Sequence, residues 1–266
     1  MKKRVSLVLS ILLFIVSLVG CTKNKANESQ NDSSQKETII TVAAAASLKN
    51  CMEDKLIPMF QEKYPNIKVQ GTYDSSGKLQ SQIQEGADID VFMSAAIKQM
   101  KELNEKGLIS ENSIVELLEN KVVLITPKEN DKGIKTFEDI VKSDKIAIGD
   151  PASVPAGQYA KELFENLKLW EVVSSKASLG TNVTEVLTWV AEGSADAGVV
   201  YSTDAASNNK VEVVAEAKEG TVAKVIYPIG IIKSTKNNDS AKAFTDFLQS
   251  DEVIKVFETY GFTSNK

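Results

Sequence analysis

The 266-residue chain contains no histidine, and this absence excludes much chemistry. Its only arginine is Arg4, near the amino terminus, so the other basic residues are lysines. Without histidine, neither a Ser-His-Asp nor a Cys-His catalytic arrangement can form. The two cysteines cannot fill the shell of a usual zinc site, and the body of the chain has no arginine to clamp phosphate or carboxylate. Hydroxyls, lysines, carboxylates and backbone N–H groups remain.

The amino-terminal segment has the composition of an export signal. Lys2, Lys3 and Arg4 precede residues 5–19, which carry no charge, as in secretory signals. These 15 residues are fewer than the roughly 20 that a membrane-spanning helix needs. Cys21 follows directly after Gly20, an arrangement that resembles the bacterial lipoprotein signal. The resemblance implies that residues 1–20 are a signal peptide and that Cys21 is lipidated, whereas an ordinary secretory signal with a chance cysteine is the alternative.

Residues 21–37 are predicted to form a flexible tether. They are rich in Asn, Ser, Gln and Lys, and Ala26 is the only apolar residue after Cys21, so they cannot bury enough apolar surface to fold. Anchored through several acyl chains, the protein would lie on the extracytoplasmic face of the cell membrane. Removal of the leader with its three basic residues changes the net charge from −5 to −8, which argues against nucleic acid as a partner.

From residue 38 onward, β-branched runs alternate with helical stripes, which predicts an α/β fold with helices covering parallel strands. Several of the runs are continuously apolar, as is typical of strands buried on both faces. The predicted strands are residues 39–42, 67–69, 89–92, 122–125, 146–148, 199–201, 211–214 and 225–232. The clearest helical stripes begin near residues 48, 159 and 183, and a last helical stretch breaks near residues 250–251.

Two places are predicted to carry the chain between two lobes. At residues 120–127 a strand enters a turn that contains Pro127, and at residues 224–231 Pro228 interrupts a strand. Two such crossings predict a discontinuous first lobe, residues 38–120 and 226–266, and a second lobe, residues 121–225. A cleft between two α/β lobes is a common ligand site.

Four predicted helix starts are rich in small and hydroxyl residues. They are residues 43–48, 73–79, 149–157 and 180–183. Ser47 is a favourable N-cap type, Gly77 permits tight backbone geometry, and Pro155 suits a first helical turn. Unpaired N–H groups and the helix dipole make each start a potential anion site. Plain capping is the alternative for each of them taken singly.

Six motifs in order along the chain resemble the bacterial molybdate-binding protein, the solute-binding subunit of a molybdate ABC importer. They cover nearly all of residues 38–266 and lie at residues 41–48, 75–79, 86–95, 149–160, 198–205 and 260–262. The resemblance implies a type II periplasmic-binding-protein fold whose two lobes close on one molybdate or tungstate ion. It also implies an ABC permease as partner, a monomer, no cofactor and no enzymatic activity.

The same resemblance implies a ligand shell of neutral donors. Carried onto matching positions, these donors are the hydroxyls and N–H groups of Ser47 and Ser76, the N–H groups of Ala156 and Val183, and the Tyr201 hydroxyl. The assignment of Val183 as a ligand rests on its spacing from the motifs alone. Molybdate at neutral pH is an unprotonated dianion, which suits a shell of donors, whereas phosphate retains a proton and favours an acceptor. Sulfate is also unprotonated, so ion size must exclude it.

Other interpretations stay open at this point. The site could serve another tetrahedral oxyanion, such as sulfate or phosphate. The protein could be an exported hydrolase that uses Ser47 or Ser76 with a lysine base, or a scaffold lipoprotein without a ligand. Cys51, on an apolar helical face, is interpreted as a core residue rather than a reactive thiol. Asp88 and Asp90 are interpreted as hydrogen-bonding loop residues rather than as metal ligands.

Overall fold

The computed structural model of the protein describes residues 37–129 and 132–265. Cys21, the leader and nearly all of the tether lie outside the described residues, so lipidation stays a prediction. In the described part of the chain, no helix has the length and apolar character required to cross a membrane.

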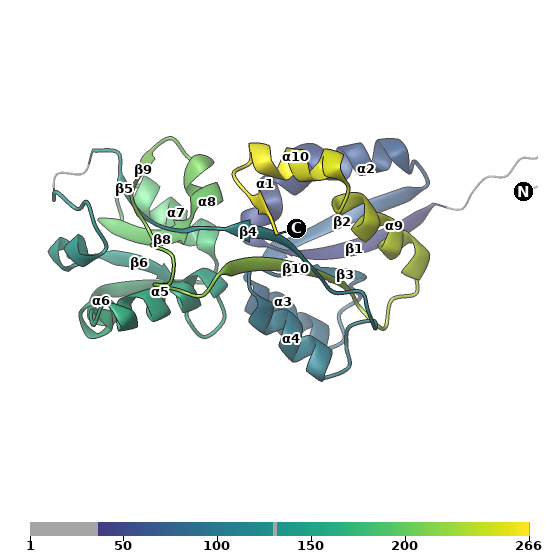
Figure 1. Ribbon diagram of the computed structural model, residues 1–266, viewed down its shortest axis with the longest axis horizontal. Coiled ribbons are helices and arrows are strands. Elements are labelled where there is room, and N and C mark those ends of the chain that lie inside the picture. Colours follow the sequence, from purple (N-terminus) through teal and green to yellow (C-terminus); the bar gives the residue numbers. More distant parts are fainter. Residues whose placement is uncertain (1–36, 130–131, 266) are drawn as a thin grey trace, which may run out of the picture. The chain divides into compact units, whose positions relative to one another are not determined.

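The strands form two separate mixed sheets (Figure 1). The first has six strands in the order β11-β4-β10-β3-β1-β2. Its members are β1 (Thr38–Ala45), β2 (Ile67–Asp74), β3 (Val91–Met93), β4 (Val115–Asn120), β10 (Val225–Ile231) and β11 (Thr263–Ser264). β1 pairs in parallel with β2 and β3, whereas β10 is antiparallel to β3 and β4.

The second sheet has five strands in the order β7-β6-β8-β5-β9. Its members are β5 (Val122–Pro127), β6 (Ile146–Gly149), β7 (Ala177–Gly180), β8 (Ala197–Tyr201) and β9 (Val211–Glu216). The chain passes from the first sheet to the second between Asn120 and Val122 and returns between Glu216 and Val225. The first change of sheet lies within the predicted crossing at residues 120–127, whereas the return comes before most of the second predicted crossing, because residues 225–231 already form β10. The division into two lobes stays a prediction.

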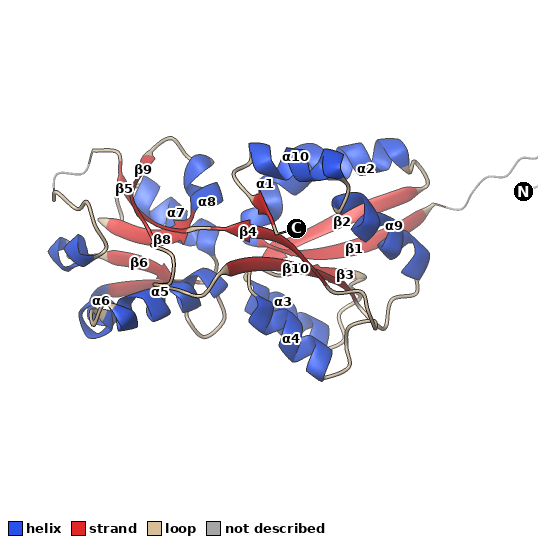
Figure 2. Ribbon diagram, viewed as in Figure 1, coloured by secondary structure: helices blue, strands red, loops and turns tan. Residues whose placement is uncertain are grey.

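Helices cover both faces of the first sheet (Figure 2). Alternation along β1 shows why: Ala43 belongs to one apolar cluster, whereas Val42 and Ala44 belong to another. The helices on the Ala43 side are α3 (Ser76–Gln84) and α4 (Ile97–Glu105), and those on the other side are α1 (Lys49–Cys51), α2 (Ile57–Lys63), α9 (Asn238–Leu248) and α10 (Asp251–Thr259). Burial on both faces confirms the interpretation of the continuously apolar strands.

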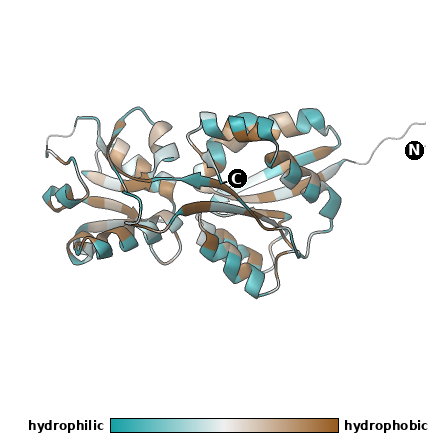
Figure 3. Ribbon diagram, in the orientation of Figure 1, coloured by the Kyte–Doolittle hydropathy of each residue, from teal (hydrophilic) through white to brown (hydrophobic). Residues whose placement is uncertain are grey.

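The second sheet is flanked by α5 (Pro155–Asn166), α6 (Trp170–Lys176), α7 (Val183–Ala191) and α8 (Ser202–Ala206). Figure 3 shows apolar stretches on strands such as β10, while the helices carry both polar and apolar stretches. The predicted stripe of α7 is confirmed, because Val183, Val186, Leu187 and Val190 are all buried. Packing of such amphipathic faces stabilises these helices more than their intrinsic propensity does.

All eight predicted strands are present, but three further strands, β4, β7 and β11, were not predicted. The first strand is also longer than predicted and extends through Ala45. Pro228 does not end its strand: β10 continues through it, and the pairing with β4 shifts register between Tyr227 and Pro228. A β-bulge accommodates a residue that cannot donate to the ladder.

The first predicted helix is segmented rather than continuous. A 3-10 turn (Ala46–Leu48) and α1 lead into a π-helical stretch (Met52–Leu56) before α2. Pro58 lies in the first turn of α2 and has no N–H for the residue four positions earlier, Asp54. Insertion of a wider turn ahead of such a residue is a usual cause of an irregular helix.

Candidate oxyanion-binding site

The five residues predicted as donors line one small pocket. On the side of the first sheet its walls include Ser47, from the 3-10 turn, and Ser76, from α3. On the side of the second sheet they include Ala156 from α5, Val183 from α7 and Tyr201 from β8. The pocket has a volume of about 10 Å³. The structure therefore brings together segments that are up to about 150 residues apart in sequence.

Ser76 occupies the first residue of α3 and is fully buried. Its Oγ accepts a hydrogen bond from the Ala95 N–H at 3.0 Å. A backbone N–H can only donate, so the Ser76 hydroxyl proton stays available for another acceptor. The helix is capped by the preceding residue, Ser75, whose Oγ accepts from the Lys78 N–H. Ser76 is thereby free of the capping role and presents a donor to the pocket.

Ser47 lies in the pocket wall, but the expectation that it caps a helix is wrong. The N-cap of the 3-10 turn is Ala45, and Ser47 lies inside the turn because β1 runs further than predicted. Its Oγ lies 2.8 Å from the hydroxyl of Tyr227, a residue that the sequence analysis did not identify. Tyr227 is fully buried in β10, and its sequence context gave no sign that its hydroxyl would reach this pocket.

Ala156 and Val183 place helix starts in the pocket. Pro155 is the first residue of α5, as predicted, and Ala156 is the second. Val183 is the first residue of α7, whose N-cap Asn182 accepts from the Glu185 N–H at 3.0 Å. N–H groups in a first helical turn have no intrahelical acceptor, and the helix dipole adds partial positive charge there. The N–H groups of Ala156 and Val183 are therefore well placed to donate hydrogen bonds to an anion.

Tyr201 ends β8, and only 1% of its surface is exposed. Its hydroxyl has no hydrogen-bond partner among the described residues. Burial raises the pKa of this phenol well above its ordinary value of 10.0, so the hydroxyl keeps its proton. An unpaired buried donor of this kind costs about 1–3 kcal/mol. An acceptor in the pocket would remove that cost.

A backbone contact joins the two walls next to the pocket. The Gly77 N–H on α3 donates to the Ser153 carbonyl, in the turn before α5, at 2.9 Å. A Cβ atom at position 77 would lie 2.3 Å from that carbonyl oxygen. The tight geometry predicted for Gly77 is therefore a close approach between segments associated with different sheets.

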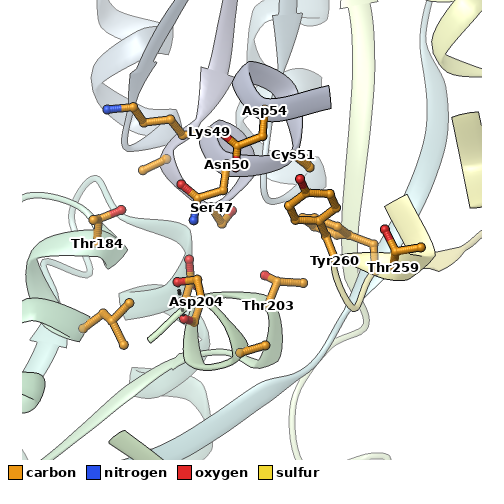
Figure 4. A pocket seen from close by; sticks show the side chains of 15 residues that line it. Ser47, Lys49, Asn50, Cys51, Asp54, Thr184, Thr203, Asp204, Thr259 and Tyr260 are labelled. Carbon is orange, nitrogen blue, oxygen red and sulfur yellow. Dashed lines mark hydrogen bonds between the residues drawn. The ribbon is translucent and has the colours of Figure 1, made fainter. Parts of the chain in front are cut away.

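A larger cavity of about 440 Å³ adjoins the small pocket and shares Ala46 and Ser47 with it (Figure 4). Asp54 and Asp204 line this cavity. Asp204 accepts from the Tyr201 N–H at 3.1 Å, and burial raises its pKa from 3.8 to about 7. Lys49 also lines the larger cavity and Asp74 lines the small pocket, so charge alone does not decide between them. The small pocket is the better candidate because all five predicted donors lie in its lining.

The alternative chemistries find little support in the described residues. No group of three His, Cys, Asp or Glu side chains there could hold a metal ion. Asp90 accepts from the Thr41 N–H at 2.7 Å, which confirms its hydrogen-bonding role. The Lys78 ammonium pairs with Asp74 at 2.9 Å rather than with a serine hydroxyl.

Cys51 is a core residue, as predicted. Only 1% of its surface is exposed, and its S–H donates to the Leu48 carbonyl at 3.1 Å. Burial raises the pKa of the thiol to about 12, so it does not supply a thiolate near neutral pH.

Two α/β sheets with a donor-lined pocket between their loops define a class of binding proteins that hold small solutes. A model of the family described as "Bacterial extracellular solute-binding protein" matches residues 40–263. The chain belongs to this family, and its fold is the predicted type II periplasmic-binding-protein fold.

The relatives are more specific. The "Putative ABC transporter substrate-binding lipoprotein YvgL" of Bacillus subtilis is 42% identical over 99% of this chain and 100% of its own length. The molybdate-binding protein ModA of Haemophilus influenzae is 37% identical, with coverage of 85% of this chain and 90% of that protein. The periplasmic molybdate-binding protein of Azotobacter vinelandii shares the fold, with a TM-score of 0.75 at 21% identity over 85% of this chain and 100% of that one.

Proposed function

We propose that this protein captures molybdate, and tungstate as a near-isosteric ion, outside the cytoplasm and delivers it to an ABC permease. ModA of Haemophilus influenzae, a relative at 37% identity, is named for molybdate binding, and YvgL is named as a lipoprotein of an ABC transporter. The proposed ligands are Ser47, Ser76, Ala156, Val183 and Tyr201. No covalent step and no cofactor are part of this function.

The observation that carries the proposal is the unpartnered hydroxyl of Tyr201 in a pocket that is also lined by Ser47 and Ser76. The Ser76 hydroxyl oxygen already accepts from the Ala95 N–H, so the hydroxyl proton is also available to donate to a bound ion. Such donors suit an oxyanion without protons. Phosphate at neutral pH carries at least one proton and would bring its own donor to this shell.

The binding step we propose is closure of two lobes, residues 38–120 with 226–266 and residues 121–225. The pocket, at about 10 Å³, is no larger than the space of one water molecule, so an ion with four oxygens needs its walls to move apart. The contact between Gly77 and Ser153 would then form late, when the walls return around the ion. Closure of this kind is a usual response of two-lobe binding proteins to a ligand.

We further propose that Cys21 anchors the mature protein to the outer face of the cell membrane and that residues 22–37 act as a tether. The protein would then act as a monomer that presents its closed form to the permease. The lipoprotein name of the relative YvgL supports the anchor.

The test is a calorimetric and thermal-shift panel of molybdate, tungstate, sulfate and phosphate on the purified protein. Molybdate and tungstate should bind and raise the melting temperature, because a ligand that binds only the native state stabilises it. Equal shifts from sulfate or phosphate would contradict the assignment of the ion. No response to any anion would contradict the function, and turnover of ester or phosphoester substrates would favour the hydrolase.

A further inference from the structure

We infer that a buried hydrogen-bond chain, Asn120 to Tyr227 to Ser47, directs the Ser47 proton into the pocket and so sets its preference for unprotonated oxyanions. The inference rests on the proposed function, because it assigns Tyr227 and Asn120 as positioning residues for the proposed ligand Ser47. Neither of them lines the small pocket.

The chain begins with the orientation of the Asn120 amide. Its Oδ1 accepts from the Lys121 N–H at 2.8 Å and from the Ser202 hydroxyl at 2.9 Å. Since a backbone N–H can only donate, the oxygen must be on that side and the NH₂ group on the other. The NH₂ group accordingly donates to Thr203 Oγ1 at 2.9 Å and to Tyr227 Oη at 3.2 Å.

The second link is the Tyr227 hydroxyl. It is fully buried, and the described hydrogen bonds give its oxygen two partners, Asn120 and Ser47. Because the Asn120 amide donates to this oxygen, the phenolic proton has only Ser47 Oγ, at 2.8 Å, to receive it. The opposite direction would leave a buried O–H unpaired, which is unfavourable. Burial also raises the pKa of Tyr227 well above 10.0, so that the phenol remains a donor.

The third link is Ser47 itself. Its Oγ accepts from Tyr227, so its own proton is left for an acceptor in the space that Ser47 lines, which includes the small pocket as well as the larger cavity. Ser76 is held in the same donor state by the Ala95 N–H. With both serines committed to donating, a protonated oxyanion finds neither hydroxyl ready to accept its proton. A serine without this constraint can rotate and accept instead.

Packing holds the chain in place independently of its hydrogen bonds. The Tyr227 ring makes edge contacts with Phe262, at 5.3 Å between centroids, and with Tyr201, at 5.8 Å. Phenylalanine at position 227 can keep these ring contacts and lose only the hydroxyl. The substitution Tyr227→Phe therefore tests the hydroxyl of Tyr227 separately from the packing of its ring.

The experiment measures dissociation constants for molybdate and phosphate by calorimetry at pH 7 in wild type and Tyr227→Phe. Molybdate affinity should fall by roughly 2- to 13-fold, as for loss of one hydrogen bond of about 0.5–1.5 kcal/mol. Phosphate affinity should fall less or rise, so that the selectivity ratio between the two ions decreases. Tyr159→Phe, which removes a neighbouring hydroxyl that donates to the Lys224 carbonyl at 3.4 Å, should leave the ratio unchanged.

A double-mutant comparison separates positioning from general damage. In a Ser47→Ala background, Tyr227→Phe should no longer change the selectivity ratio, because the hydroxyl that it directs is gone. An unchanged ratio in the single Tyr227→Phe variant, or the same change with and without Ser47, would overturn the inference. Wild type that binds no oxyanion would instead refute the proposed function, so the two failures are distinguishable.

Discussion

At the scale of single residues, the candidate site is built from neutral groups whose hydrogen-bonding state is determined by their neighbours. Ser76 is made a donor by the Ala95 N–H, and the backbone of Tyr201 is held by the Asp204 carboxylate. The five residues were predicted from a family resemblance, and they do meet in one pocket. The bonding of Ser47 was not predictable, since it depends on a tyrosine 180 residues away.

Tyr201→Phe tests the unpartnered hydroxyl. If that hydroxyl donates to a charged ion, its loss should raise the free energy of the complex by about 1.5–3 kcal/mol and weaken molybdate binding roughly 10- to 150-fold. Stability without ligand should stay the same or increase, because an unsatisfied buried donor disappears. Calorimetric titration gives the affinity and a thermal melt gives the stability. An unchanged dissociation constant would remove Tyr201 from the site.

Gly77→Ala tests the close approach beside the pocket. The added methyl group would lie 2.3 Å from the Ser153 carbonyl oxygen, which is backbone and cannot simply rotate away. Overpacking of about 1–3 kcal/mol should appear as molybdate affinity reduced roughly 5- to 150-fold, if closure forms this contact. Gln82→Ala, at an exposed position on the same helix, is the matched control and should bind like wild type. Equal affinities for the two variants would show that closure does not need the contact.

At the scale of elements, the strands that were predicted are those with dense β-branched runs, such as β5 and β10. The strand β4 was not predicted because Glu116 and Glu119 interrupt its apolar residues. β7 is a short edge strand with two of its four residues exposed, and β11 has only two residues. Their strand conformation depends on partners that are distant in sequence, so local pattern alone could not reveal it.

The start of α7 combines a cap with a proposed ligand. Asn182 accepts from the Glu185 N–H, and the next residue is Val183. Asn182→Ala should lower the free energy of unfolding by about 1 kcal/mol through loss of the cap. Asn182→Ser keeps a capping oxygen and should restore most of that stability. Urea denaturation of both variants measures the difference, and equal losses in the two would argue against a capping role.

At the scale of the whole molecule, an acidic protein is proposed to bind a dianion. The chain carries a net charge of −5, yet the charge that matters at the pocket comes from local dipoles at the starts of α3, α5 and α7. Asp54 and Asp204 line the larger cavity, whereas Asp74 lines the pocket itself, where its carboxylate accepts from the Ser75 N–H at 2.8 Å and pairs with the Lys78 ammonium at 2.9 Å. The net charge of the chain therefore does not decide the sign of the ligand, because the dipoles at these helix starts are the charges nearest to the proposed ion.

Burial of Asp204 makes a prediction for the stability of the whole fold. The pKa of this carboxyl is raised from 3.8 to about 7, so between these values the native state holds a proton that the unfolded chain has released. Stability from this group is therefore fully present below about pH 4, falls as the pH rises to about 7, and is constant above it. The loss is on the order of 4 kcal/mol, from a shift of about three pKa units.

Asp204→Asn should remove that part of the pH dependence, since the amide oxygen can still accept from the Tyr201 N–H and does not ionise. Denaturant titrations between pH 4 and pH 8 should show wild type losing stability relative to this variant up to about pH 7. Asp139→Asn is the control, because the pKa of that partly exposed carboxyl is lowered to about 2 by Lys142 and it titrates below this range. If wild type and Asp204→Asn kept parallel profiles, Asp204 would be ionised in the native protein throughout, and the larger cavity would hold a permanent negative charge beside the anion pocket.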